Sequence, residues 1–263
     1  MDPTRLLLLL STIAFVGGLV HAIVVIRAGA WKESRWHLVP MAIGFTLQCA
    51  FLYLRGQAHG RCPLTNLFEV FIFIGWCIVL LYFLVGTAYR LSLLGVFTAP
   101  LLAALQTFVL LSPMPPPSAK VLASKVNPWL EMHASLALMS YAAFALACVT
   151  GVMFLMQDYL LKQHRIHALF HQLPPIQKLS KAVVRMVALG VVLLSVAMVF
   201  TFKIVDPIPA SKLYVGWGIL AFYAVILLLM WFHTLGSRHT AWLAVLGFAA
   251  PVLSLWVVTS SRA

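Results

Sequence analysis

Apolar runs of about 20 residues recur from one end of this 263-residue chain to the other, and this pattern restricts its fold more than any other feature. A run of this length, wound into a helix, spans the hydrocarbon core of a bilayer. Charged residues make up 9% of the chain, against about a quarter in soluble domains, so a water-soluble core does not explain the runs. We therefore predict an all-α polytopic membrane protein.

About eight transmembrane helices are predicted, and they are expected to form a single integral membrane domain over residues 1–263. Their ranges are 5–27, 38–55, 65–87, 91–111, 129–161, 182–204, 213–235 and 241–260. Span 129–161 reaches about 50 Å as a helix, so its end is expected to project into water. Span 5–27 is expected to be a retained helix, because its apolar run is longer than the roughly 7–15 residues of a signal peptide.

The net charge of +12 comes from Lys and Arg in short loops between the spans. Loops on the inner side of a membrane are rich in these residues, so the charge does not indicate a nucleic-acid partner. The loop after span 129–161 is the most basic and is predicted to lie inside. Both termini and the Pro-rich stretch 112–128 are then predicted to lie outside.

Histidines within apolar spans are functional candidates, because an ionisable group inside a membrane is costly. His133 lies near the outer end of span 129–161, after a helix start with Asn127 as N-cap and Pro128 in the first position. A helix places Tyr141 on the same face, which then offers a nitrogen ligand, hydroxyls and an aromatic ring. Two interpretations are open: a haem or metal ligand, or a hydrogen-bonded interfacial histidine.

Two further histidines fall in the inner half of the bilayer under this topology. His21 lies about two-thirds of the way through span 5–27, and His233 lies near the end of span 213–235. Two neutral imidazoles at similar depth on different helices could ligate one haem iron. Alternatively, each ring reaches toward the interface or bonds a backbone carbonyl.

The loop after span 38–55 gathers polar residues on the predicted outer side. His59 lies between Arg55 and Arg61, whose guanidinium groups suit carboxylates such as the propionates of haem; interfacial anchoring is the alternative. Glu69 follows at the start of the next span. An acid there stabilises a helix through its dipole, and the same position suits a polar internal lining.

Two blocks of sequence carry a family resemblance. LQCAFLYLRGQAHGRCPLTNLFEVFIFIGW contains Pro63, Asn66 and Glu69 in a Pro-x-x-Asn-x-x-Glu pattern, and WLEMHASLALMSYAAFALACV places a Ser-Tyr pair after His133. With LPPIQKLSKAVVRMVALGVVLLSVAMVF following, this order resembles the CcsA/HemX-like cytochrome c assembly family from about residue 40 to 250. His233 falls where the cytochrome c synthetase branch of that family has a membrane histidine.

The chain departs from that branch in two places. The synthetase branch has a Trp-rich outer loop, whereas FKIVDPIPASKLY contains Asp206–Pro207 and no tryptophan. That branch also has an outer histidine in its last part, and none follows Gly247 here. The chain therefore resembles the shorter HemX-type branch more closely. That branch is associated with haem metabolism, including control of glutamyl-tRNA reductase.

The resemblance implies a multi-pass protein of the bacterial inner (plasma) membrane that binds or handles haem in cytochrome c assembly or haem supply, and that is not an enzyme on its own. The sequence contains no Cys-x-x-Cys-His, so the haem is expected to be b-type and non-covalent. The candidate haem-site residues are His133, His21, His233, His59, Tyr141, Glu69, Arg55 and Arg61, with His133, His21 and His233 as iron ligands. Expected partners are the lipid bilayer, haem, and a cytochrome c assembly partner or a soluble tetrapyrrole enzyme.

Two alternatives belong to other classes. A haem-free membrane scaffold would recruit a soluble tetrapyrrole enzyme through the basic inner loop 162–185. A small-molecule permease would need no cofactor.

Overall fold

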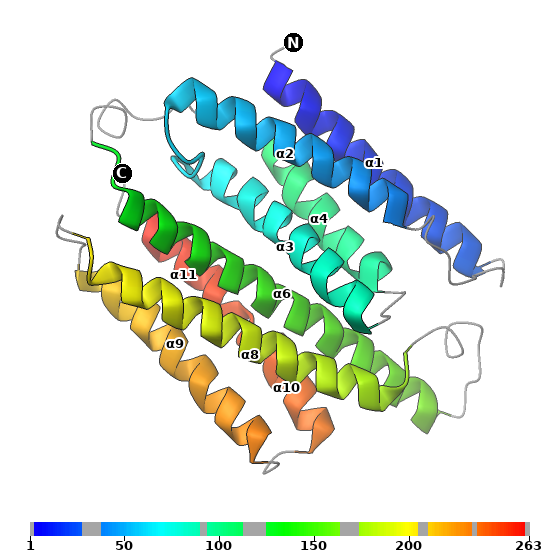
Figure 1. Ribbon diagram of the computed structural model, residues 1–263. Helices are drawn as coiled ribbons and strands as arrows, with labels where there is room; N and C mark the ends of the chain where they lie inside the picture. Colours follow the sequence, from blue (N-terminus) through cyan, green and yellow to red (C-terminus); the bar gives the residue numbers. More distant parts are fainter. Residues whose placement is uncertain are drawn as a thin grey trace. The chain divides into compact units, whose positions relative to one another are not determined.

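The computed structural model describes residues 3–27, 38–89, 94–112, 125–163, 174–204, 210–232 and 236–260 (Figure 1). Within these ranges the regular structure is helical and no strand is found, which confirms the predicted all-α membrane fold. Six of the described helices are long and apolar enough to cross a bilayer. They are Pro3–Arg27, Leu67–Val85, Leu94–Leu111, Pro128–Lys162, Ile176–Thr201 and Leu213–Trp231.

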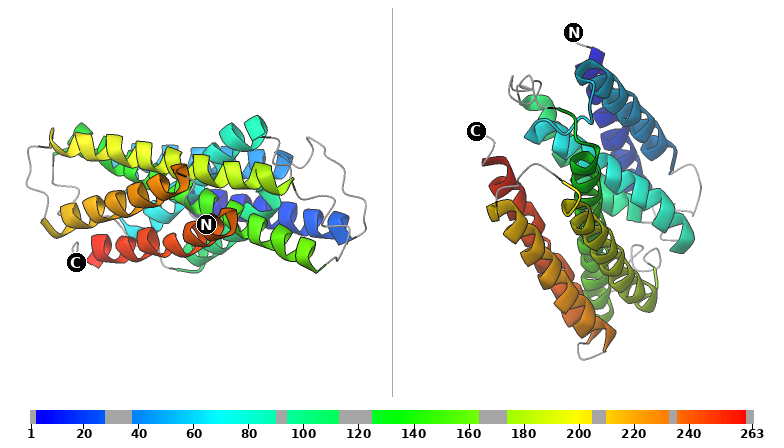
Figure 2. Two further views of the ribbon diagram at one scale, coloured as in Figure 1. Left: turned by 90° about the horizontal axis from the view of Figure 1, so that it is seen from below. Right: turned by 60° about the vertical axis from the view of Figure 1, so that its left-hand side comes forward.

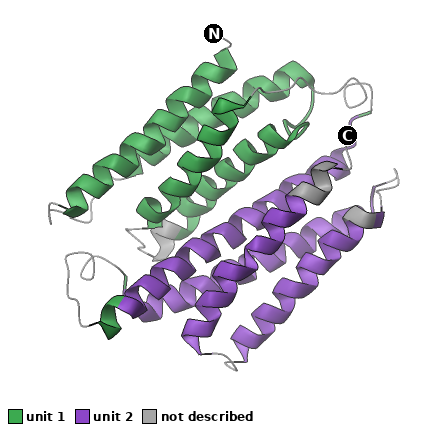
Figure 3. Cartoon of the chain, turned by 180° about the vertical axis from the view of Figure 1, so that it is seen from behind, with its two compact units in different colours: residues 1–125, 160–174 green, residues 126–159, 175–263 purple. Residues whose placement is uncertain are grey.

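The chain divides into two compact units, coloured separately in Figure 3. Unit 1 comprises Met1–Lys125 and Leu160–Pro174, and unit 2 comprises Val126–Tyr159 and Pro175–Ala263. The expected single membrane domain over residues 1–263 stays a prediction.

Unit 1 contains a four-helix bundle. Its helices are α1 (Pro3–Arg27), α2 (Val39–His59), α3 (Leu67–Tyr89) and α4 (Leu94–Leu111). Helix α1 packs on α2 and α4, and α3 packs on the same two helices, so the four close into a ring. One buried layer takes a single apolar side chain from each helix: Leu8, Phe51, Ile72 and Val109.

Buried polar side chains clamp three of these helices together. The hydroxyl of Ser11 on α1 donates to the carbonyl of Gly44 on α2 (3.0 Å) and accepts from the side-chain amide of Gln106 on α4 (3.2 Å). The hydroxyl of Thr12 lies 3.1 Å from the amide oxygen of Gln106. Polar groups inside a membrane protein must find partners within it, so these contacts add specific links between apolar helices.

Unit 2 is built around one long central helix, α6 (Pro128–Lys162), which matches the predicted long span. The other helices are α8 (Ile176–Thr201), α9 (Ala210–Trp231), α10 (Ser237–Gly247) and α11 (Ala249–Ser260), and Figure 2 shows them running along α6. Between residues 138 and 157 nearly every side chain of α6 is buried. A helix that is apolar on all sides is expected at such a central position.

The last predicted span, 241–260, is not one helix. The structure has two short helices, α10 and α11, separated at Phe248. Pro251 explains the break, because its ring nitrogen cannot donate to the carbonyl of Gly247, four residues earlier. Neither short helix, nor α2 with its polar Gln48 and Arg55, is among the six described helices that could cross a bilayer alone. Membrane crossing by α2 and by the segment 241–260 stays a prediction.

Exposed aromatic side chains gather at both ends of unit 2. At the end where α6 begins they are Trp129, Phe202, Tyr214 and Trp217, and at the end where α8 begins they are Tyr159, Trp231, Phe232 and Trp242. Tryptophan and tyrosine are enriched at the two surfaces of a bilayer, where their amphipathic rings sit at headgroup level. The two groups therefore mark the depths at which unit 2 leaves the hydrocarbon core.

Gly190 marks the closest crossing of α6 and α8. A Cβ atom there would lie 2.3 Å from the ring of Phe144, and that ring stacks on Tyr223 of α9 with centroids 3.6 Å apart. The ring has no room to retreat, so we expect Gly190→Ala to lower the free energy of unfolding by about 1–3 kcal/mol. Gly218→Ala on α9 is the matched control, since a Cβ there meets open space. It should be neutral or slightly stabilising, because alanine favours a helix. Chemical unfolding in detergent compares the two variants, and equal effects would contradict the tight crossing.

Candidate functional site

The loop between α2 and α3 is tied to a fully buried carboxylate, that of Glu69. Arg55 donates to its Oε1 from Nε (2.9 Å) and Nη2 (2.6 Å). Thr65 donates to Oε2 from its backbone N–H (2.9 Å) and its hydroxyl (2.7 Å). The side chain of Glu69 is 0% exposed and that of Arg55 14%. A buried charge is tolerated when it is paired and hydrogen-bonded in this way.

Local sequence explains how this cluster is held. Helix α2 ends at His59, and Gly60 follows with a φ of 61°, the left-handed conformation in which glycine commonly ends a helix. Asn66 then caps α3, because its Oδ1 accepts the N–H of Glu69 at 2.9 Å. Glu69 thus lies in the first turn of α3, where an acid was expected to favour the helix, and also binds the chain that precedes it.

His59 and Arg61 border the same cluster. Nε2 of His59 lies 3.6 Å from Oε1 of Glu69, close enough for an ion pair when the imidazole is protonated. Nε of Arg61 is buried. The structure therefore brings Arg55, His59 and Glu69 together. Two N–H groups of Arg55 are already used by Glu69, and contact of Arg55 or Arg61 with a haem propionate stays a prediction.

His133 is fixed by a hydrogen bond to a neighbouring helix. Helix α6 begins as predicted, with Pro128 first and Oδ1 of Asn127 accepting the N–H of Trp129 at 3.1 Å. Nδ1 of His133 then lies 2.7 Å from the carbonyl oxygen of Ala197 on α8. A carbonyl oxygen only accepts, so Nδ1 is the donor, and a neutral ring with this hydrogen bond has its lone pair on Nε2. Metal-bound histidines commonly have this arrangement, in which the ring nitrogen that does not bind the metal donates to a carbonyl.

An aromatic pair accompanies His133. Trp129, one turn earlier on α6, stacks on Phe200 of α8 with centroids 5.6 Å apart and planes inclined by 26°. Trp129 is 44% exposed, so part of its surface is accessible. An imidazole on the same helix face as accessible aromatic surface suits a flat macrocycle, which takes an axial nitrogen ligand and apolar contact. The sequence interpretation missed Trp129, although its spacing of four residues places it on the face of His133.

Tyr141 belongs to the interior of unit 2. Its hydroxyl lies 2.9 Å from that of Ser254 on α11, which donates to the carbonyl of Pro251 at 2.6 Å. Tyr141 is buried, and the eight residues that separate it from His133 correspond to a rise of about 12 Å. The two side chains are therefore bonded to different helices, His133 to α8 and Tyr141 to α11.

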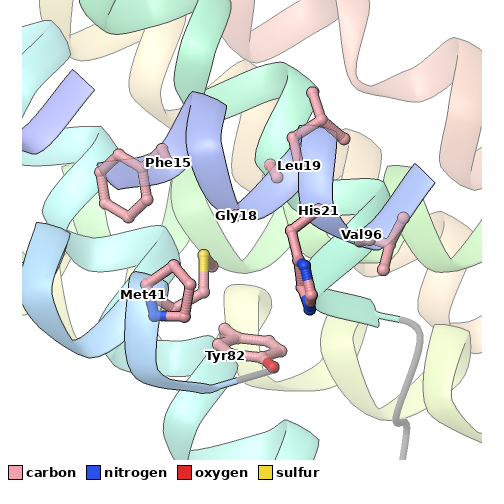
Figure 4. A pocket seen from close by; sticks show the side chains of 11 residues that line it. Phe15, Gly18, Leu19, His21, Met41, Tyr82 and Val96 are labelled. Atoms are coloured by element: carbon pink, nitrogen blue, oxygen red, sulfur yellow. The ribbon is translucent and has the colours of Figure 1, made fainter. Parts of the chain in front are cut away.

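His21 lines a small cavity within unit 1. Figure 4 shows its imidazole pointing from α1 into space that Met41 of α2 and Tyr82 of α3 also line. The cavity measures about 30 Å³, enough for one or two water molecules. A pocket for a drug-sized molecule needs roughly 300–1,000 Å³, so a macrocycle does not fit inside. His21 as a residue is nevertheless exposed, and a haem bound to it would lie outside this cavity. His233 lies outside the described residues.

Comparison with known proteins gives the family. Residues 64–205, just over half of the chain, match the family described as cytochrome c assembly protein. The chain belongs to this family. The matched segment contains Glu69, His133 and Tyr141, whereas His21 and His233 lie outside it.

Individual relatives bear two names. The chain is 36% identical over 107 residues to "Cytochrome c biogenesis protein CcsA" of Chlorella vulgaris, which covers 40% of this chain and 34% of that protein. It is 29% identical over 168 residues to "Protein HemX" of Brevibacillus brevis, covering 64% and 61%, and 28% identical over 173 residues to "Protein HemX" of Bacillus subtilis, covering 65% and 60%. The chain thus matches about a third of the CcsA protein and about three-fifths of the HemX proteins.

Proposed function

We propose that this protein binds haem in the membrane and handles it in cytochrome c assembly or in haem supply. The observation that carries the proposal is the hydrogen bond from Nδ1 of His133 to Ala197, because it holds the ring and leaves Nε2 as a ligand nitrogen. The aromatic pair of Trp129 and Phe200 supports it by offering apolar contact beside that nitrogen. Membership of the cytochrome c assembly family supports the same chemistry.

The residues of unit 2 fit a non-covalent, b-type haem. His133 would hold the iron through Nε2, and Trp129 would contact the macrocycle from the same helix face. When bound, the haem supplies an iron that takes axial nitrogen ligands and changes oxidation state. The task of the chain is to orient the imidazole, which the N-cap at Asn127 and the carbonyl of Ala197 perform together.

The proposal is tested by one optical spectrum of detergent-purified protein, recorded oxidised and reduced, with the haem content quantified. We expect protein from cells that are replete in haem to show a Soret band that corresponds to a stoichiometric amount of haem. Protein that lacks this band and co-purifies with a soluble tetrapyrrole enzyme would contradict the proposal and favour the haem-free scaffold. A permease would show neither the band nor the enzyme.

That His21 and His233 ligate one haem iron stays a prediction from the sequence. If both ligate one iron, His21→Ala and His233→Ala should each remove the same low-spin signal, and the double variant should lose little more, because two ligands of one metal act as a unit. Electron paramagnetic resonance at low temperature measures the low-spin iron signal of the three variants. Independent, additive losses would show that the two histidines do not share an iron.

The proposed setting is the bacterial inner membrane, with both termini outside. Lys178, Lys181 and Arg185 at the start of α8 and Arg238 at the start of α10 then face the inside, which agrees with the bias of basic residues toward that side. His133 and the aromatic group around Trp129 lie at the opposite, outer end of unit 2, the side on which c-type cytochromes would receive haem.

A further inference from the structure

A second surface of unit 2 carries basic side chains where α8 begins. Lys178, Lys181 and Arg185 are all exposed, and their spacing of three and four residues places them on one side of the helix. The opposite side is buried and apolar, with Leu179, Ala182, Val183, Met186 and Val187. The start of α8 is therefore amphipathic, although the rest of the helix is apolar.

Arg238 extends this surface from a neighbouring helix. It lies at the start of α10, which packs against α8, and its Nε is 3.7 Å from Oδ2 of Asp158 on α6. In Figure 1 the starts of α8 and α10 and the end of α6 lie toward the same end of unit 2. We call Lys178, Lys181, Arg185 and Arg238 the basic surface.

Positive charge exceeds negative charge on the basic surface. The described residues of unit 2 include two acids, Glu131 and Asp158, and Glu131 lies at the opposite end of α6. Asp158 is the acid near the basic surface, and it already lies beside Arg238. Among the described residues of unit 2, the basic surface thus has four cations against one nearby carboxylate, and this net positive charge attracts anions.

The depth of the basic surface identifies the kind of anion. Helix α8 has 26 residues and a length of about 39 Å, whereas about 20 residues cross the hydrocarbon core. Lys178 and Lys181 lie in the excess at its start. Exposed Tyr159 and Trp242 at the same end mark the headgroup level, and the longer Arg185 side chain reaches that level along the helix. Lipid phosphates occupy this depth.

We propose that the basic surface binds the phosphate headgroups of anionic phospholipids. The proposal is independent of haem, since the surface lies at the opposite end of unit 2 from His133. Each Lys or Arg close to an anionic membrane contributes roughly 1 kcal/mol to binding, so removal of two lysines corresponds to about a 30-fold loss of affinity.

The test compares two lipids in the full-length protein. Thermal unfolding in detergent is followed while phosphatidylglycerol or phosphatidylcholine is added, and bound lipid is counted by native mass spectrometry. Phosphatidylglycerol should raise the unfolding temperature and remain bound, with about 30-fold weaker binding for the Lys178→Gln/Lys181→Gln variant. Lys203→Gln, two residues beyond the opposite end of α8, is the matched control and should bind phosphatidylglycerol as the parent protein does.

Three results would overturn the proposal. Equal stabilisation by both lipids would show that the surface does not select anionic headgroups. Equal stabilisation by free glycerol phosphate would show that the anion need not belong to a lipid. Binding of polyglutamate that depends on Lys178 and Lys181, without a preference for phosphatidylglycerol, would assign the surface to an acidic protein partner. The exposed lysines leave the core intact, so all variants should unfold at the parent temperature in pure neutral detergent.

Discussion

His133→Ala is expected to abolish the spectrum of the haem that we propose to bind where α6 begins. At this end of α6 the imidazole of His133 offers Nε2 as a nitrogen that can ligate iron. The ring is oriented by the carbonyl oxygen of Ala197, which lies 2.7 Å from Nδ1. Alanine removes the ligand without disturbing the N-cap at Asn127, so the helix should still form. Haem content and the reduced and oxidised spectra of the purified variant measure the loss.

Substitutions at the same position separate ligation from packing. His133→Met should retain a weakened and shifted spectrum, because a thioether also ligates haem iron. Added imidazole should restore the spectrum of His133→Ala by filling the vacated ligand position. Tyr141→Phe is the control, since its hydroxyl is bonded to Ser254 in the interior, and this variant should keep the parent spectrum. An unchanged spectrum in folded His133→Ala would leave His133 as a packed interfacial side chain.

Arg55→Met should produce the largest loss of stability in unit 1. The substitution leaves the carboxylate of Glu69 buried, with 0% exposure, and without the guanidinium that lies 2.6 Å away. Removal of one partner of a buried ion pair lowers the free energy of unfolding by about 3–5 kcal/mol, a large fraction of the total stability of a domain. The free energy of unfolding in detergent measures the effect.

Arg238→Met provides the contrast. Arg238 is 59% exposed and its nitrogen lies 3.7 Å from Asp158, so this pair is worth at most about 1 kcal/mol. The double variant Arg55→Met/Glu69→Gln should recover part of the loss of Arg55→Met, because no uncompensated charge remains in the core. Similar losses for Arg55→Met and Arg238→Met would mean that Glu69 is not buried as the structure has it.

The helices could be predicted closely from the sequence, because each membrane crossing requires about 20 apolar residues and polar residues flank each crossing. Span 129–161 corresponds to α6 at Pro128–Lys162, with the predicted cap at Asn127. Span 182–204 was placed late, since α8 begins at Ile176: its first turns are amphipathic and carry lysines, and a search for uniformly apolar runs excludes them. Residues 241–260 were expected to form one span, although Pro251 within it accounts for the break at Phe248.

The contacts within the candidate site could not be predicted. Ala197, which fixes His133, lies 64 residues away and contributes only a backbone carbonyl, so no side-chain pattern points to it. Arg55 and Glu69 were recognised as candidates, yet their pairing depends on how α2 and α3 turn about their axes. A helix that is apolar on all sides, such as α6, gives no sequence signal for the direction of each face. Tyr141 and His133 were grouped together from their spacing along one helix, and that spacing does not reveal that the structure bonds them to different neighbouring helices.

The central claim, that Nε2 of His133 is an iron ligand, is tested most directly by an electron cryo-microscopy structure of the haem-loaded protein. We predict iron at coordination distance from Nε2, about 2 Å as in other histidine–metal bonds, with Nδ1 still bonded to the carbonyl of Ala197 and Trp129 against the macrocycle. Haem density that is held by other residues, with Nε2 of His133 facing protein or lipid, would contradict the claim.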